Sequence, residues 1–404
     1  MSEAFVVAAR RTPIGRVGGV LRNLRVESLA APVMRAVLAD AGLAAGDVDE
    51  VVLGNVWGPG GNPARVAALT AGLDQSVPGL TIDRQCASGL EAINLAARLV
   101  RDGAAEVCLA GGVESVSTAP WRIDKPATLY QTPAFSSRAR FAPDAAGDPE
   151  MGPAADTLAR VHGVSRARQD QFAADSHRKA IAAAAAGRFD GEIVALPASN
   201  RAAAGPPPAG GWVDPIMVDQ SPRAGLTARS LSRFPPVFSP DGTVTAGNSS
   251  PINDGAAVVA VVSDAVRRRI ELPTALRVVE GVAAGVDPAM PGAGPIAATQ
   301  ALFKRVATVE LNAVDLVELT EAFAGQALAC VDALGIAEER LNVAGGAIAL
   351  GHPWAASGAV LVTRLFTEMV RAPQAGAGEP APRYGLATVA GAGGLGVATL
   401  FERT

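Results

Sequence analysis

The 404-residue sequence is poor in charged and aromatic residues, and it has no long hydrophobic or basic run. Hydrophobic residues make up 49% and charged residues 18%, a composition that excludes an intrinsically disordered chain. With a net charge of −4 and no basic run, nucleic acid is not expected as a partner. No apolar stretch reaches the roughly 18 residues that span a bilayer, so no membrane partner is expected.

Cysteine and histidine are equally scarce. The three cysteines, Cys86, Cys108 and Cys330, are too few and odd in number for a disulfide framework, which predicts a reducing cytoplasm. No set of cysteines and histidines has the spacing of metal ligands, so no metal site is expected.

The sequence is rich in small residues, and its apolar segments alternate between strand-like and helix-like patterns. Strands are predicted over 5–8, 50–53 and 106–110, and helices over 29–41 and 86–100. Such alternation predicts a parallel or mixed sheet covered by helices. The length exceeds what one hydrophobic core usually serves, so two or three domains or a duplicated unit are expected.

Part of the first half recurs in the second. The tripeptide Ala87–Ser88–Gly89 returns as Ala356–Ser357–Gly358, each time before an apolar helix, and 47–54 resembles 313–320. We interpret this as gene duplication, with two like units packed face to face; coincidence is the alternative. The region 116–240 is different, being richer in Arg, Asp and Pro, and its segment 201–211 is predicted to be a loop, as is 372–382.

Cys86 is the first candidate catalytic residue. The segment 83–89, DRQCASG, places a thiol where a strand gives way to a helix. A helix N-terminus is expected to lower the thiol pKa, and its free N–H groups can hold an oxyanion. The alternative is that Cys86 is a small buried hydrophobic residue.

His352 is the second candidate. It lies in the glycine-rich segment AGGAIALGHP, directly before the second repeated helix. If the two units pack face to face, His352 comes close to Cys86, and a histidine beside a cysteine activates the thiol as a nucleophile.

The sequence resembles the thiolases over nearly its whole length. The motifs that carry the resemblance include RQCASGLEA, LAGGVES, MGPAADTLA, TVTAGNSSPINDGAA, TEAFAGQ, GGAIALGHPWAASG and LATVAGAGGLGVA. The resemblance implies an α/β thiolase fold, in which two βαβαβαββ halves form a five-layered αβαβα core. It implies an N-terminal half over 1–115 and 241–268, an inserted loop domain over 116–240 and a C-terminal half over 269–404.

The resemblance also implies the chemistry. The substrates would be coenzyme A thioesters, with acyl-CoA and CoA as partners, no permanently bound cofactor, and a homodimer or homotetramer. Cys86 would accept the acyl group and His352 would activate it. The further roles implied are an oxyanion hole from the backbone N–H groups of Cys86 and near Ala392, a pantetheine contact at Ser250, a contact with the CoA nucleotide end at Arg223 and an acyl-pocket contact at Met151.

Several positions depart from the thiolase pattern. The second cysteine of carbon–carbon-bond-forming thiolases is Ala390 here, the asparagine of the Asn-Glu-Ala-Phe motif is Thr320, and a glycine after the serine pair is Pro251. Claisen chemistry needs a proton-transfer group that a methyl cannot provide. Glu321 is the best substitute, and the hydroxyl of Thr320 could keep a bound water; the alternative for Glu321 is a structural carboxylate.

The predicted function is therefore a thiolase-like acyl-CoA C-acyltransferase of the acetyl-CoA acetyltransferase type. One alternative is an acyltransferase or hydrolase that performs no carbon–carbon chemistry. The other is a subunit that binds acyl-CoA without turnover.

Overall fold

The structure is a computed structural model that describes residues 3–136, 138–197, 215–372 and 381–404. The loop predicted over 201–211, and most of the one predicted over 372–382, lie outside the described residues. No helix in the described part of the chain is both long and apolar enough to cross a bilayer.

The N-terminal part alternates strands and helices as predicted. Its elements are β1 (Ala4–Arg11), β2 (Gly15–Arg16), α1 (Val26–Ala41), β3 (Glu50–Gly54), α2 (Pro63–Ala71), β4 (Gly79–Ile82), α3 (Ser88–Asp102), β5 (Val107–Glu114), β8 (Asn253–Ser263) and α7 (Asp264–Arg269). The helix expected from residue 86 begins at Ser88, because residues 84–87 form a turn.

The C-terminal part follows a similar plan. Its elements are β9 (Leu276–Gly285), α8 (Gly294–Arg305), β10 (Leu316–Leu319), α9 (Ala324–Leu334), α10 (Ala347–Leu350), α11 (Trp354–Phe366), β11 (Tyr384–Gly391) and β12 (Leu395–Arg403). The repeated tripeptides therefore stand at the starts of α3 and α11, which occupy equivalent places in the two parts.

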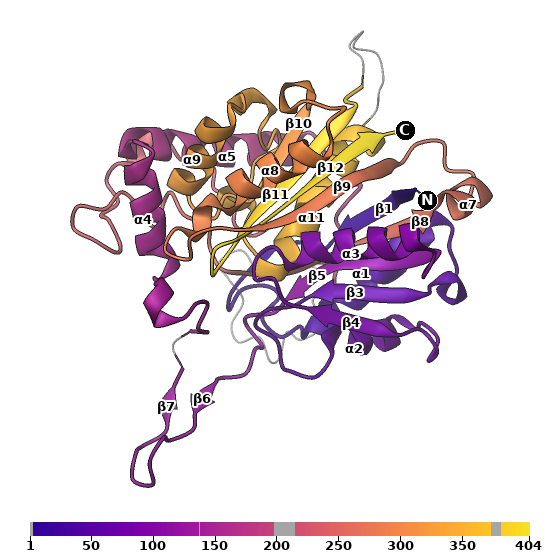
Figure 1. Cartoon of the computed structure of the whole chain (residues 1–404), viewed down its shortest axis with the longest axis horizontal. Helices are drawn as coiled ribbons and strands as arrows, with labels where there is room; N and C mark the ends of the chain where they lie inside the picture. The colour runs from indigo at the N-terminus through magenta and orange to yellow at the C-terminus, as the bar shows by residue number, and fades with distance from the viewer. Residues whose placement is uncertain (1–2, 137, 198–214, 373–380) are drawn as a thin grey trace.

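The strands form a mixed sheet in the order β10-β11-β12-β9-β1-β8-β5-β3-β4. The pairs β3–β4, β3–β5 and β10–β11 are parallel, and the other pairs on this path are antiparallel. The two halves join at β1 and β9, where only Phe5 with Arg277 and Val6 with Leu276 are paired. In Figure 1 the indigo and purple elements β3, β4 and α2 lie below the orange and yellow strands β10, β11 and β12.

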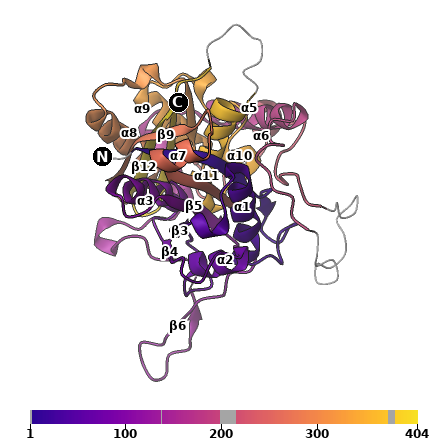
Figure 2. The same ribbon diagram turned by 90° about the vertical axis from the view of Figure 1, so that its right-hand side faces the viewer.

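Helices separate and cover the two halves of the sheet. Along β8, Ala257, Val259 and Val261 face a central core that also contains side chains of α3 and α11, while the alternate residues of the strand face α1. The helices α3 and α11 contact strands of both halves, and α8 covers the outer face of β9 and β12. α11 lies between the two halves in Figure 2, so the order of layers is the five-layered αβαβα arrangement that the sequence predicts.

The region between the halves contributes separate elements. They are the hairpin β6 (Ile123–Asp124) and β7 (Ala134–Phe135), followed by α4 (Met151–Val161), α5 (Arg166–Ala185) and α6 (Ala228–Leu231). The hairpin projects away from the body of the molecule, as Figure 1 shows. α4 and α5 pack against α9 and α10, so the insertion reaches the C-terminal half.

Glycines allow α3 and α11 to approach closely. A Cβ atom at Gly89 would lie 2.5 Å from the carbonyl oxygen of Ala355, and one at Gly358 would lie 2.5 Å from the backbone nitrogen of Leu90. Both glycines are the last residues of the repeated tripeptides. Any side chain at either position would push the two helices apart, because the atoms that it meets belong to the backbone.

We predict that Gly358→Ala destabilises the protein. The added methyl group overlaps the backbone of α3, and such overpacking costs about 1–3 kcal/mol or more. Gly46→Ala is the matched control, because a Cβ atom there meets nothing within 4 Å. Urea unfolding of both variants is the measurement, and equal free energies of unfolding would show that the close approach of the helices is not constrained at this point.

Candidate active site

Cys86 lies in a tight turn between β4 and α3. Gln85, the preceding residue, has a φ of 52°, in the left-handed region that residues other than glycine rarely adopt. The Ser88 hydroxyl closes the turn, since it accepts from the backbone N–H of Arg84 at 2.8 Å and donates to the carbonyl of Gln85 at 2.6 Å. The turn presents the partly buried Cys86 beside the N-terminus of α3.

A cavity of about 250 Å³ adjoins this cysteine. It brings together six residues singled out from the sequence: Cys86, Met151, Ser250, Pro251, His352 and Ala390. The other residues lining it are Ala154, Ala155, Ile252, Pro291, Gly292, Ala322, Phe323, Gln326 and Trp354. Among these described residues, Cys86 and His352 are the only titratable ones, so acid–base chemistry in the cavity depends on this pair.

The thiol of Cys86 is harder to ionise than an exposed cysteine. Burial raises its pKa to about 12, and the carboxylates of Glu114 and Asp83 add to this effect, while its own backbone N–H lowers the pKa. The expectation of a lowered pKa is therefore wrong, because desolvation and two negative groups outweigh the helix N-terminus. A thiolate at neutral pH requires a nearby group that accepts the proton.

His352 can accept that proton. Burial lowers its pKa to about 4, so the ring is neutral at pH 7. Its Nδ1 lies 2.6 Å from the hydroxyl of Ser357, and its backbone N–H donates to the side-chain oxygen of Asn253 at 2.9 Å. When the serine oxygen accepts from Nδ1–H, Nε2 keeps a free lone pair for the thiol proton.

Glu114 is a buried residue that the sequence reasoning missed. It ends β5, and its carboxylate accepts from the backbone N–H groups of Val56, Trp57 and Ala355 and from the side chain of Asn55. Burial raises its pKa to about 7. Glu114 thus links the loop after β3 to the first turn of α11. In the sequence it could have been noticed as the single carboxylate at the end of the apolar segment LAGGVES.

Glu321 lies outside the cavity. Its carboxylate accepts from the Ser176 hydroxyl at 2.7 Å, the Asn342 side chain at 2.8 Å and the Ile348 backbone at 3.2 Å. Burial raises its pKa. With its oxygens occupied by three donors, Glu321 holds α5 and the segment 342–348 together, which corresponds to the structural alternative.

Thr320 and Ala392 also do not line the cavity of Cys86. Thr320 instead borders a second, smaller cavity together with Ser357. Ala392 is buried in the turn between β11 and β12, two residues beyond the cavity-lining Ala390. The methyl group of Ala390 offers no proton to a substrate in the cavity.

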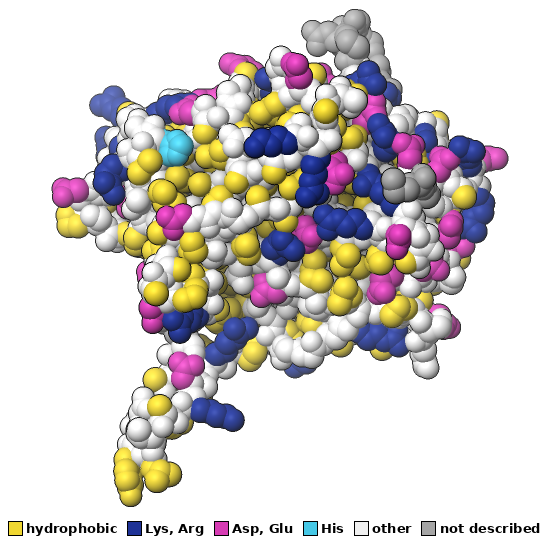
Figure 3. Space-filling view, viewed as in Figure 1, with side chains coloured by type: hydrophobic (Ala, Val, Ile, Leu, Met, Phe, Trp, Pro, Cys, Tyr) yellow, Lys and Arg dark blue, Asp and Glu magenta, His cyan; other side chains and the backbone are white. Residues whose placement is uncertain are grey.

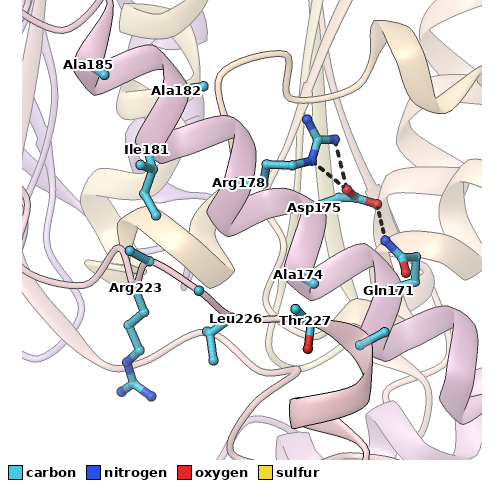
Figure 4. Close-up of a pocket in the computed structure, with 13 residues that line it drawn as sticks. Gln171, Ala174, Asp175, Arg178, Ile181, Ala182, Ala185, Arg223, Leu226 and Thr227 are labelled. Atoms are coloured by element: carbon cyan, nitrogen blue, oxygen red, sulfur yellow. Dashed lines mark hydrogen bonds and ion pairs between the residues drawn. The ribbon is translucent and has the colours of Figure 1, made fainter.

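Arg223 lies at a separate, open cavity of about 640 Å³ between α5 and the segment 223–228. Figure 4 shows its side chain directed away from α5, on which Arg178, Asp175 and Gln171 are joined by hydrogen bonds. The backbone N–H of Arg223 donates to Nδ1 of His177 at 3.2 Å, and burial lowers the pKa of that histidine to about 4. Arg223 is exposed, so its guanidinium is accessible to an anion.

No cluster of three or more histidine, cysteine, aspartate or glutamate side chains suited to a metal ion occurs among the described residues. The three cysteines are free, with Cys108 and Cys330 fully buried. The geometry therefore limits the candidate chemistry to a half-covered thiol and a neutral imidazole in an apolar cavity.

Comparisons with known proteins agree with this geometry. The family model for the thiolase N-terminal domain matches residues 4–265, and the model for the thiolase C-terminal domain matches residues 272–403. A Staphylococcus aureus protein named "Putative acetyl-CoA C-acetyltransferase VraB" is 39% identical over 405 residues, with all of both chains covered.

Two solved structures extend the similarity to three dimensions. The Bacillus anthracis acetyl-CoA acetyltransferase has a TM-score of 0.89 and 34% identity, covering 100% of this chain and 99% of its own. Human mitochondrial 3-ketoacyl-CoA thiolase in complex with CoA has a TM-score of 0.88 and 32% identity, covering 100% of this chain and 98% of its own. The predicted thiolase fold is thereby confirmed, and the chain belongs to the thiolase family.

Proposed function

We propose that this acyltransferase takes an acyl group, acetyl in the simplest case, from a coenzyme A thioester onto Cys86 and passes it to a second substrate. The supporting observation is that Cys86 and His352 line one apolar cavity that holds no other titratable side chain among its lining residues. The names of the relatives, which include acetyl-CoA acetyltransferases and a thiolase complexed with CoA, support the choice of donor.

The first half-reaction follows from the protonation states of the pair. His352 accepts the thiol proton of Cys86 at Nε2, and the sulfur attacks the carbonyl carbon of the thioester. The bond from that carbon to the CoA sulfur breaks, and the imidazolium returns its proton to the departing CoA thiolate. The new bond is a thioester on Cys86, and His352 is neutral again.

Further residues are proposed to bind the donor. Backbone N–H groups of Cys86 and in the turn near Ala392 would stabilise the negative oxygen of the attacked carbonyl. Ser250 and Met151 line the cavity and would contact the pantetheine arm and the acyl group. Arg223, exposed at the larger cavity, would bind the phosphates at the nucleotide end of CoA.

The lining of the cavity favours a second candidate function, acyl transfer to an oxygen, nitrogen or sulfur nucleophile or to water. Deprotonating a carbon atom beside a thioester requires a positioned base. Ala390, which lines the cavity in place of the second cysteine of the thiolase pattern, cannot act as one. Glu321 is held by three hydrogen bonds outside this cavity and does not replace the missing group. A neutral imidazole is a sufficient base for an alcohol, an amine or water.

We also propose a homodimer or homotetramer in a reducing cytoplasm. The edge strand β4 and the helix α2 expose Leu80, Val66 and Leu69, each by 43% or more. The projecting β6–β7 hairpin carries Leu129 and Tyr130, more than nine-tenths exposed, and Figure 3 shows hydrophobic side chains gathered at its tip. Such surfaces are typical of contacts between subunits. The three free cysteines favour a reducing compartment.

We predict a covalent acyl adduct on Cys86. Mixing the protein with acetyl-CoA and quenching in acid should add one acetyl group, detected by intact mass spectrometry. Cys86→Ser should abolish the adduct, and His352→Ala should slow its formation about 10²–10⁴-fold. Cys108→Ser is the control, because that thiol is fully buried on β5 and does not line the cavity. If exchange of labelled CoA into acetyl-CoA is absent while CoA binds tightly, the chain is a binding subunit.

We predict that iodoacetamide labels Cys86 alone among the three cysteines, and that the rate rises with pH up to at least pH 10. Burial raises the pKa of Cys86 to about 12, so the thiolate fraction keeps growing over the whole accessible range. Cys108 and Cys330 are fully buried and should remain unmodified. A rate that levels off below pH 8 would contradict the raised pKa.

We predict that Ala390→Cys increases thiolysis of acetoacetyl-CoA at least about tenfold, because it supplies a proton donor inside the cavity. Ala392→Cys places the same side chain two residues away, outside the lining of the cavity, and should bring no such gain. A wild-type rate that already equals the Ala390→Cys rate would show that another group performs the proton transfer.

A further inference from the structure

A second cavity, smaller than that of Cys86, lies beside β10 and α11 and holds about 20 Å³. A single water molecule needs about 10–15 Å³. The residues lining it are Glu318, Thr320, Gly345, Gly346, Ala347, Leu350, Gly351, Ser357, Val360, Leu361 and Arg364. Four of them, Glu318, Thr320, Ser357 and Arg364, carry polar side chains and are at most 4% exposed.

Some polar atoms of this cavity lack the hydrogen bonds that buried groups normally have. Among the described residues, Thr320 Oγ1 and Arg364 Nε have no partner. Glu318 also receives no hydrogen bond from the described part of the chain. The shift of its pKa comes from burial and from neighbouring charges. A buried polar group without a partner is costly, so two such atoms beside a buried carboxylate in one cavity indicate a bound polar molecule.

The cavity is connected to the catalytic histidine. Ser357 lines it, and the hydroxyl of Ser357 lies 2.6 Å from Nδ1 of His352. His352 in turn lines the 250 Å³ cavity together with Cys86. The imidazole thus stands between the two cavities, with Ser357 as the link.

We propose that a buried water molecule joins Ser357 to Glu318 in this cavity, and that Glu318 is a positioning residue for His352. The inference rests on the proposed role of His352. Alternation along β10 supports the placement, because Val317 and Leu319 face the outer core whereas Glu318 and Thr320 both line the cavity. Thr320 and Arg364 supply further hydrogen bonds, which gives the water the two to four partners that buried waters have.

The chain of hydrogen bonds has one consistent direction when Glu318 is ionised. The water donates to the carboxylate, the Ser357 hydroxyl donates to the water, and the Nδ1–H of His352 donates to the serine oxygen. This order holds the imidazole in the tautomer whose Nε2 accepts the thiol proton. The carboxylate also stabilises the imidazolium that forms, as the partner of a functional histidine does.

The pH range follows from the charges around Glu318. Burial raises its pKa to about 8; the charge of Arg364 lowers it, and those of Glu368, Glu321 and Glu192 raise it. Arg364 is itself paired with Glu192 and Glu368. As the pH rises through the pKa of Glu318, the carboxylate forms and favours the imidazolium, so the reactivity of Cys86 should rise. The carboxylates that act on Cys86 itself are Glu114 and Asp83, so the effect of Glu318 passes through His352.

The test is the rate of Cys86 alkylation by iodoacetamide between pH 6 and 10. In the wild type we expect a step near the pKa of Glu318, superimposed on the general rise. Glu318→Gln should remove the step and lower the rate above pH 8 about tenfold, the smaller of the 10–100-fold effects that such partners have at metal sites. Glu318→Asp should restore the step, because the water can bridge a shorter side chain.

Glu402→Gln is the matched control, since Glu402 is buried on β12 and pairs with Arg277 and Arg383 away from both cavities. It should keep the step even if its melting temperature falls. A Glu318→Gln profile that is parallel to the wild type, at equal or lower rate, would overturn the inference. Failure of acetyl-CoA to acylate a Cys86 that iodoacetamide labels normally would instead overturn the proposed function.

Discussion

The close contact between α3 and α11 is the constraint on which the site depends. Gly89 and Gly358 let the backbones of the two helices meet, and Gly112 lets β5 approach the start of α11, where a Cβ atom would lie 2.1 Å from the carbonyl of Ala355. Each helix begins beside a functional residue, Cys86 or His352. Because the helices touch near these ends, residues 266 positions apart in the sequence line the same cavity.

The repeated tripeptide has acquired a different task in each half. Within the described part of the chain, the Ser88 hydroxyl bonds only to the backbone of the turn before α3, and these bonds fix the conformation that presents Cys86. Ser357 bonds to the imidazole of His352 and borders the smaller cavity. One hydroxyl at equivalent positions thus shapes the turn of the proposed nucleophile in the first half and contacts its proposed base in the second. The two serines occupy equivalent positions at the starts of α3 and α11, and the residues before each serine set what its hydroxyl can bind.

Much of this arrangement could be predicted from the sequence. The alternating apolar segments indicated a sheet covered by helices, the repeated tripeptide indicated the meeting of Cys86 with His352, and the resemblance to the thiolases implied the five layers. The pKa of Cys86 could not be predicted, because the burial that raises it arises from distant segments such as α4 and the turn of Ala390. The sequence motif favoured Glu321 as a substitute for the missing group. In the structure Glu321 lies past the end of β10 and bonds to Ser176, Asn342 and Ile348. Glu318 lies within β10, and its side chain lines the same cavity as Ser357, the partner of His352. The sequence alone does not show which of Glu318 and Glu321 faces this cavity, because that depends on the register of the strand.

Burial in the 250 Å³ cavity keeps both members of the proposed catalytic pair, Cys86 and His352, neutral at pH 7. Burial raises the pKa of the thiol and lowers that of the imidazole, so both shifts oppose formation of the thiolate–imidazolium pair. A neutral thiol is oxidised less readily than a thiolate. Proton transfer must then be coupled to attack on the thioester, where the oxygen of the attacked carbonyl takes up the negative charge. In the proposed reaction, the groups that favour the imidazolium therefore control the rate, and Glu318 and Ser357 lie in the smaller cavity, not in the cavity of Cys86.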